Sequence, residues 1–118
     1  MTEDLAMTDN TKASGADGAG VLVIWTDVAP AAEADFNAWY DNQHLAERVG
    51  VPGFRNGRRY AALEGAPRYL AWYETDTPAV LGSTAYGERQ ANPTAWTQRI
   101  MPSFRNVTRV TAARLAKS

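Results

Sequence analysis

The chain has no cysteine and a single histidine in 118 residues. Without cysteine it can form neither a disulfide nor a thiolate metal site, and one imidazole is too few ligands for a typical transition-metal centre. We therefore expect no metal site. The absence of cysteine also fits a reducing compartment.

Neither sign of charge dominates, with 12 Lys and Arg against 13 Asp and Glu. A partner such as nucleic acid or an anionic membrane calls for a basic excess, so we expect neither. The longest apolar run, residues 21–25, is far too short to cross a bilayer. The first residues lack the basic and apolar segments of a signal peptide, so the expected location is the cytoplasm.

The length and the 45% hydrophobic content fit one globular domain with one core. Residues 1–19 have few apolar side chains and no periodicity, which predicts a disordered N-terminal tail. The single domain is then expected over residues 20–118.

Hydrophobic pattern and turn residues predict the order β-α-β-β-α-β. The first strand, residues 21–28, is apolar enough to be buried on both faces. Pro30 suits the first turn of a helix that runs to about Arg48 and ends at Gly50 and Pro52. The remaining elements are a hairpin of residues 54–63 and 68–75, a helix from Pro78 to about Tyr86, a short helical piece at 94–101 and a strand at 104–115.

This order defines the ferredoxin-like α+β fold, an antiparallel four-stranded sheet with both helices on one face. The predicted strands nevertheless carry large side chains on both faces of the sheet. In the first strand, Leu22 and Ile24 point to one face and Val23 and Trp25 to the other. The helix-free face therefore needs a cover, and a second copy of the chain is the simplest one. We expect a homodimer.

The first helix carries the only histidine. At helical spacing Phe36, Tyr40, His44 and Glu47 share one face, where an ordinary amphipathic helix would place Leu or Val. Trp39 lies about a quarter-turn away and is expected to pack on the second helix or on a partner. A histidine can exchange a proton near neutral pH, and Glu47 could orient its ring. The alternative is a structural histidine bonded to a neighbouring strand.

The run Phe36-Asn37-Ala38-Trp39-Tyr40 with His44, followed by Val51-Pro52-Gly53-Phe54 and Arg58-Arg59-Tyr60, resembles the dimeric α+β barrel superfamily. It looks closest to EthD-like and other small members, and the resemblance covers residues 21–115. It implies a dimer in which two sheets face each other, and a pocket between each sheet and its helices. It would place His44 and Tyr40 at that pocket as catalytic residues. The superfamily includes haem enzymes, so haem held by the lone histidine is the alternative to no cofactor.

Several further residues are candidates for substrate binding, because rings with polar neighbours commonly line small-molecule pockets. Arg59 and Tyr60 must point to opposite faces of their strand, and Trp72 and Glu74 to the same face. Whichever of Arg58, Arg59 and Arg109 faces inward could bind a carboxylate or an enolate. The alternatives are core packing for the rings and a cross-strand ion pair with Glu74 for the arginines. The full set of candidates is Phe36, Arg59, Tyr60, Trp72, Glu74 and Arg109.

The functional hypothesis is a cofactor-free enzyme acting by proton transfer on an oxygenated aromatic or lactone-like molecule, by isomerisation, cyclisation or dehydration. His44 would be the base and Tyr40 would donate a hydrogen bond to the developing oxyanion. One alternative is a cofactor-free monooxygenase that deprotonates a dihydroxyaromatic. The other is a non-catalytic ligand-binding or accessory protein, for which the cavity would be filled by Trp and Tyr side chains.

Overall fold

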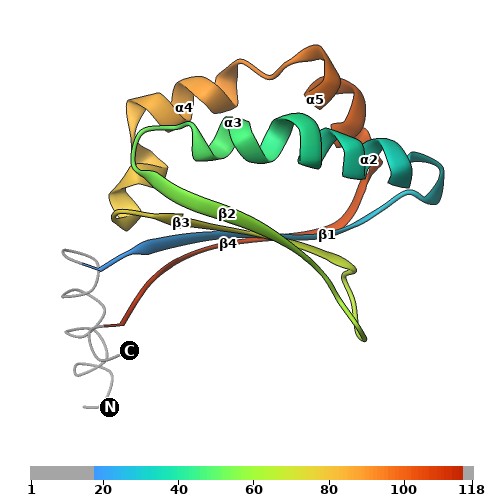
Figure 1. The fold of residues 1–118 in the computed structure, drawn as a ribbon, viewed down its shortest axis with the longest axis horizontal. Helices are drawn as coiled ribbons and strands as arrows, with labels where there is room; N and C mark the ends of the chain where they lie inside the picture. The colour runs from blue at the N-terminus through green and yellow to red at the C-terminus, as the bar shows by residue number, and fades with distance from the viewer. Residues whose placement is uncertain (1–17, 116–118) are drawn as a thin grey trace.

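The computed structural model describes residues 18–115, which form one antiparallel sheet covered on one face by a layer of helices (Figure 1). The strands are β1 Gly20–Val28, β2 Phe54–Ala61, β3 Tyr69–Thr75 and β4 Phe104–Ala113. The helical elements are η1 Pro30–Ala32, α2 Glu33–Trp39, η2 Tyr40–His44, α3 Leu45–Val49, η3 Pro78–Gly82, α4 Thr84–Ala91, α5 Ala95–Ile100 and η4 Met101–Ser103.

The strand order is β2-β3-β1-β4, and each neighbouring pair is antiparallel. This is the sheet of the ferredoxin-like fold, so the predicted fold class is confirmed. The predicted order of elements and the hairpin are also confirmed, with boundaries that differ by one or two residues in each strand.

The helical layer differs from the expectation in the second half of the chain. The predicted helix from Pro78 is a 3₁₀ turn, η3, and the α-helix α4 begins only at Thr84. Ser83 separates the two because its backbone is extended and its side chain accepts a hydrogen bond from the Tyr86 N–H, as an N-cap residue does. The helix then continues past Tyr86 to Ala91.

The two faces of the sheet differ in burial. Toward the helices, Leu22, Phe36, Trp39, Tyr73 and Ile100 belong to the buried core. On the opposite face Trp25, Tyr60 and Val110 are 36%, 51% and 45% exposed. The prediction that the first strand is buried on both faces is therefore wrong for a single copy of residues 18–115, because none of their helices covers this side of the sheet.

Most of the predicted tail, residues 1–17, lies outside the described residues. Of the remainder, Ala19 is buried, and its carbonyl accepts a hydrogen bond from the Arg114 N–H. Within residues 18–115 no helix has the length and apolar character that crossing a membrane requires.

Candidate functional site

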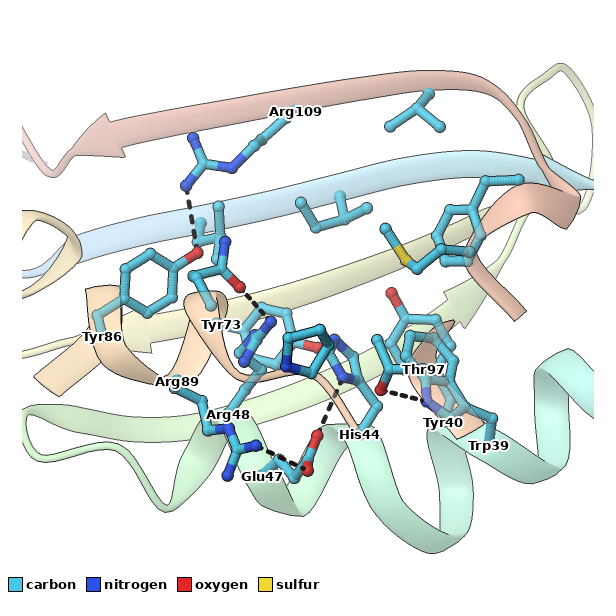
Figure 2. A pocket seen from close by; sticks show the side chains of 17 residues that line it. Trp39, Tyr40, His44, Glu47, Arg48, Tyr73, Tyr86, Arg89, Thr97 and Arg109 are labelled. Atoms are coloured by element: carbon cyan, nitrogen blue, oxygen red, sulfur yellow. Dashed lines mark hydrogen bonds and ion pairs between the residues drawn. The ribbon is translucent and has the colours of Figure 1, made fainter. Parts of the chain in front are cut away.

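A cavity of about 560 Å³ lies between the helical layer and the sheet (Figure 2). One part of its wall is apolar. Another part carries ionisable and hydroxyl-bearing side chains from six different elements. The lining residues are Leu22, Ile24, Trp39, Tyr40, His44, Glu47, Arg48, Tyr73, Tyr86, Arg89, Gln90, Pro93, Thr97, Met101, Phe104, Val107 and Arg109.

The first helix presents His44 to this cavity through a π-helical turn. The Leu45 N–H bonds to the Tyr40 carbonyl, five residues back, so side chains five apart are brought into register. The rings of Trp39 and His44 consequently stack, with centroids 4.1 Å apart and planes inclined by 17°. Tyr40 meets the same imidazole edge-on at 5.3 Å. Such turns occur frequently at functional sites.

His44 is held neutral. Burial, together with the smaller effect of the positive charges of Arg48 and Arg89, lowers the pKa of its imidazole to about 3. Its Nδ1 lies 3.5 Å from Oε1 of Glu47. These two atoms are too far apart for a full hydrogen bond, and Nδ1 has no other hydrogen-bond partner among the described residues. The predicted contact with Glu47 is present, but it is a weak one.

Two tyrosine hydroxyls accompany the imidazole. Burial raises the pKa of Tyr40 to about 12, and it raises the pKa of Tyr73 further still, with Tyr40 contributing to that rise. Both phenols therefore stay protonated near neutral pH, so each can donate its proton in a hydrogen bond. Tyr73 is 1% exposed, and its hydroxyl has no partner with full hydrogen-bond geometry within the described residues, although the Tyr40 hydroxyl lies near enough to affect its pKa. A buried donor without a partner, at the wall of a cavity, is available to a ligand.

Three arginines line the cavity, from α3, α4 and β4. The Arg48 guanidinium lies 5.7 Å from the centroid of the Tyr86 ring, and Arg109 Nη2 donates to the Tyr86 hydroxyl at 3.2 Å. Arg89 Nη2 lies 3.8 Å from Oε2 of Glu47. Arg109 is thus the one among the predicted arginines that lines the cavity.

The other predicted substrate-binding residues lie outside the cavity. Phe36 is fully buried in the core, where it packs against Tyr40 and Phe104. Trp72 and Glu74 belong to the helix-free face, because they alternate with the buried residues of β3. Tyr60 belongs to the same face because it pairs with Leu70, which shares their parity. Glu74 accepts a hydrogen bond from Asn56 at 3.4 Å, and no described residue forms the expected ion pair with it.

Arg59 faces the helices but does not line the cavity; it contacts Tyr40, which does. Its guanidinium lies 4.5 Å from the centroid of the Tyr40 ring, and it bonds to Asp41 and Asn37 at 3.0 and 2.7 Å. These contacts fix the position of Tyr40 without reaching the cavity.

Sequence reasoning missed Arg48, Arg89, Tyr73 and Tyr86, and assigned Trp39 to packing only. Trp39 was expected to pack on the second helix or on a partner, whereas its Nε1 donates to Thr97 Oγ1 of α5 at 3.0 Å and its ring lines the cavity. Helical spacing could have indicated Arg48, because it lies four residues after His44 and therefore on the same side of the helix. The other residues come from elements far away in the sequence.

No group of three or more His, Cys, Asp or Glu side chains in residues 18–115 could hold a metal ion.

No protein-family model matches the chain, and no curated protein sequence matches it either. Solved structures do match its fold. The haem degrader MhuD of Mycobacterium tuberculosis, solved with two haems in its active site, has a TM-score of 0.56 at 14% identity, covering 80% of this chain and 94% of that one. An EthD family protein of Bacillus halodurans has a TM-score of 0.54 at 11% identity, covering 83% and 99%.

A third match, HapK of Hahella chejuensis, has a TM-score of 0.54 at 13% identity and covers 84% of this chain and 95% of that one. Identities this low establish the fold alone. The resemblance to dimeric α+β barrel proteins is thus confirmed at the level of the fold, and this chain has their ferredoxin-like α+β architecture.

Proposed function

We propose that the chain binds a small oxygenated aromatic or lactone-like molecule in its cavity and catalyses proton transfer on it without a cofactor, by isomerisation, cyclisation or dehydration. The observation that carries this proposal is one cavity wall that combines the neutral imidazole of His44 with the unpartnered hydroxyl of Tyr73.

His44 is the proposed base. A neutral imidazole has a free nitrogen lone pair, so it can accept a proton from a carbon next to a carbonyl group or from a phenol. The charges of Arg48 and Arg89 weaken it as a base, and an anionic substrate bound beside them would offset that effect. Glu47 is positioned to favour the imidazolium that forms, because its carboxylate faces Nδ1. The negative charge left on the substrate oxygen would be met by Tyr40 and Tyr73, which remain donors at any pH the protein encounters.

A non-catalytic accessory role is less well supported. It predicts a cavity filled by aromatic side chains, whereas Trp39, Tyr40, Tyr73 and Tyr86 surround about 560 Å³ of open space. A cofactor-free monooxygenase would use the same His44 to deprotonate a phenol, and oxygen consumption in the assay below would identify it.

Haem is the alternative occupant, since MhuD binds two haems on the same fold. The residues of the cavity fit a haem in one respect. Neutral histidine is the form that ligates haem iron, and His44 lines the cavity in that form. His44 would hold the iron, and bound haem would supply redox chemistry. A titration with haemin, followed by its absorption spectrum in the unmodified chain and in His44→Ala, tests this alternative directly.

We also propose that a second copy of the chain covers the helix-free face of the sheet. Trp25, Tyr60 and Val110 expose large apolar surface there, and β4, at the edge of the sheet, is exposed along almost its whole length. A soluble monomer rarely leaves such a patch open.

The test of catalysis follows hydrogen–deuterium exchange by NMR in a panel of cyclic ketones, lactones and hydroxylated aromatic ketones in D₂O. The protein should accelerate exchange next to the carbonyl of at least one compound, and His44→Ala should reduce that rate by about 10²–10⁴-fold. Asn42→Ala, an exposed position in the same helical turn, is the matched control. Exchange that survives in His44→Ala, or no acceleration across the panel, would contradict the proposal.

A further inference from the structure

We propose that the ligand of this cavity is an aromatic carboxylate, whose carboxylate group is bound by Arg48, Arg89 and Arg109. This inference rests on the proposed function and names its substrate class. The observations that support it are the convergence of the three guanidinium groups, the excess of their charge over the single carboxylate of Glu47, and the apolar character of the remaining wall.

Tyr86 brings two of the arginines together. It is the buried residue of α4, with 5% of its surface exposed. Arg48 lies over its ring, and Arg109 binds its hydroxyl from the sheet side of the cavity (Figure 2). Arg89 projects from the next turn of α4 toward Glu47. Guanidinium groups from the helical layer and from the sheet therefore meet at one end of the cavity.

The positive charge at this end is not balanced by the described residues. Glu47 is the only acidic side chain in the lining, and it already faces His44 as well as Arg89. The hydrogen-bond partner of Arg48 is the neutral Gln90, and that of Arg109 is the neutral Tyr86. Guanidinium groups arranged in this way are suited to a carboxylate, which accepts two parallel N–H bonds from one arginine.

The rest of the wall fits a flat apolar body. Leu22, Ile24 and Phe104 form part of it, together with the stacked Trp39. A ring system placed there would leave its acidic group directed to the arginines and would lie next to His44. The substrate class is thus a molecule with an aromatic body and an anionic end.

A carboxylate fits this end better than a phosphate does. Phosphate sites are commonly built from backbone N–H groups of glycine-rich loops or helix N-termini, and no glycine lines this cavity. Arg48 and Arg89 instead stand in the last turns of α3 and α4, where the partial negative charge of the helix end opposes a doubly charged group.

Binding of the acid would also affect His44. The groups that face its imidazole are Glu47 and Arg48 from α3, Arg89 from α4, and the uncharged phenols of Tyr40 and Tyr73. The charges of Arg48 and Arg89 lower the pKa of His44. A carboxylate bound between them cancels part of that effect, so the substrate itself would make His44 a stronger base.

The test compares three molecules with the same ring system, 1-naphthoate, 1-naphthamide and 1-naphthyl phosphate, by isothermal titration calorimetry at pH 7. The proposal predicts that the unmodified chain binds naphthoate at least about tenfold more tightly than the neutral amide, as expected for hydrogen bonds to a charged group. Raising the salt concentration should weaken binding of naphthoate and leave binding of the amide unchanged. These measurements need no variant, so they do not depend on how well a substituted chain folds.

Arg89→Gln and Arg109→Gln should each weaken naphthoate binding by about tenfold, with little effect on the amide. Arg55→Gln removes an exposed arginine on β2, paired with Asp76 and outside the cavity, and should change neither affinity. Equal affinity for acid and amide, tighter binding of the phosphate, or no binding of any of the three would each overturn the proposal.

His44→Ala distinguishes this inference from the proposed function. It should retain arginine-dependent binding of naphthoate even though it strongly slows catalysed exchange. If naphthoate binds as predicted and no compound shows catalysed exchange, the carboxylate site stands and the proton-transfer function fails.

Discussion

The buried, neutral state of His44 predicts a measurable dependence of stability on pH. Its imidazole has an ordinary pKa of 6.5 in the unfolded chain and a pKa of about 3 in the folded one. Between these values the unfolded state binds a proton that the folded state does not. Stability therefore falls as the pH drops from 6.5 toward 3, by up to about 1.4 kcal/mol per pH unit.

The size of the effect follows from the two pKa values. Between pH 7 and pH 4.5 this single group should reduce the free energy of unfolding by about 2.5 kcal/mol. His44→Gln removes the titrating group and keeps a polar side chain in a helix. The unmodified chain and the variant contain the same carboxyl groups, so the difference between their stabilities isolates the histidine.

The assay is urea denaturation of both proteins at pH 7, 6, 5 and 4.5, at one protein concentration, because assembly would make stability depend on concentration. The unmodified chain should lose about 2.5 kcal/mol more than His44→Gln over this range. A difference that stays constant with pH would show that His44 titrates normally in the folded state. It would then be solvated, and the account of the site as a dry wall with a neutral base would be refuted.

Two further predictions concern Tyr73 and the free face of the sheet. Tyr73→Phe should leave the melting temperature nearly unchanged or raise it, because the lost hydroxyl has no partner with full hydrogen-bond geometry among the described residues. The same variant should bind naphthoate more weakly. A clear fall in melting temperature would mean that the hydroxyl is hydrogen-bonded in the folded chain. Val110→Asp should convert the dimer into monomers, as measured by analytical ultracentrifugation. The control Val107→Asp, at a similarly exposed position on the other face of the same strand, should leave the dimer intact. A monomeric unmodified protein would contradict the proposed assembly.

The fold could be predicted from the sequence because its signals are local and agree with one another. Pro30 at a helix start, Gly50 and Pro52 at its end, and the turn before β3 divide the chain into elements of the right type and order. A β-α-β-β-α-β order then leaves few topologies. The helix break at Ser83 was missed because Pro78 suits the start of a 3₁₀ turn as well as that of an α-helix.

The candidate site could be predicted only where it lies on one helix. His44 and Tyr40 were found because they follow each other at helical spacing. Trp39 was placed on another face because the prediction assumed 3.6 residues per turn, whereas the π-turn from Tyr40 to His44 stacks residues five apart. Arg89 and Tyr73 reach the cavity through tertiary packing, about which local spacing says nothing.

A β-bulge decides which side of β2 serves the site. Phe54 pairs with Thr75 and Asn56 with Glu74, so Arg55 is an extra residue and the alternation of faces shifts by one position. Without that shift Phe54 and Tyr60 would share a face, and Arg59 would point away from the helices. With it, Phe54 is buried, Arg59 lies beneath Tyr40, and Tyr60 belongs to the free face.

One residue of the sequence, Gly57, is consistent with this bulge. The shift turns that residue toward the helices, where an added Cβ would lie 2.9 Å from the ring of Tyr73 and 3.1 Å from Val49. Only a residue without a side chain lets the Tyr73 ring lie against β2, with its hydroxyl at the cavity. The inward direction of Arg59 and the exposed position of Tyr60 are thus set by a backbone bulge at Arg55, four and five residues earlier, and strict alternation along the strand could not have indicated either.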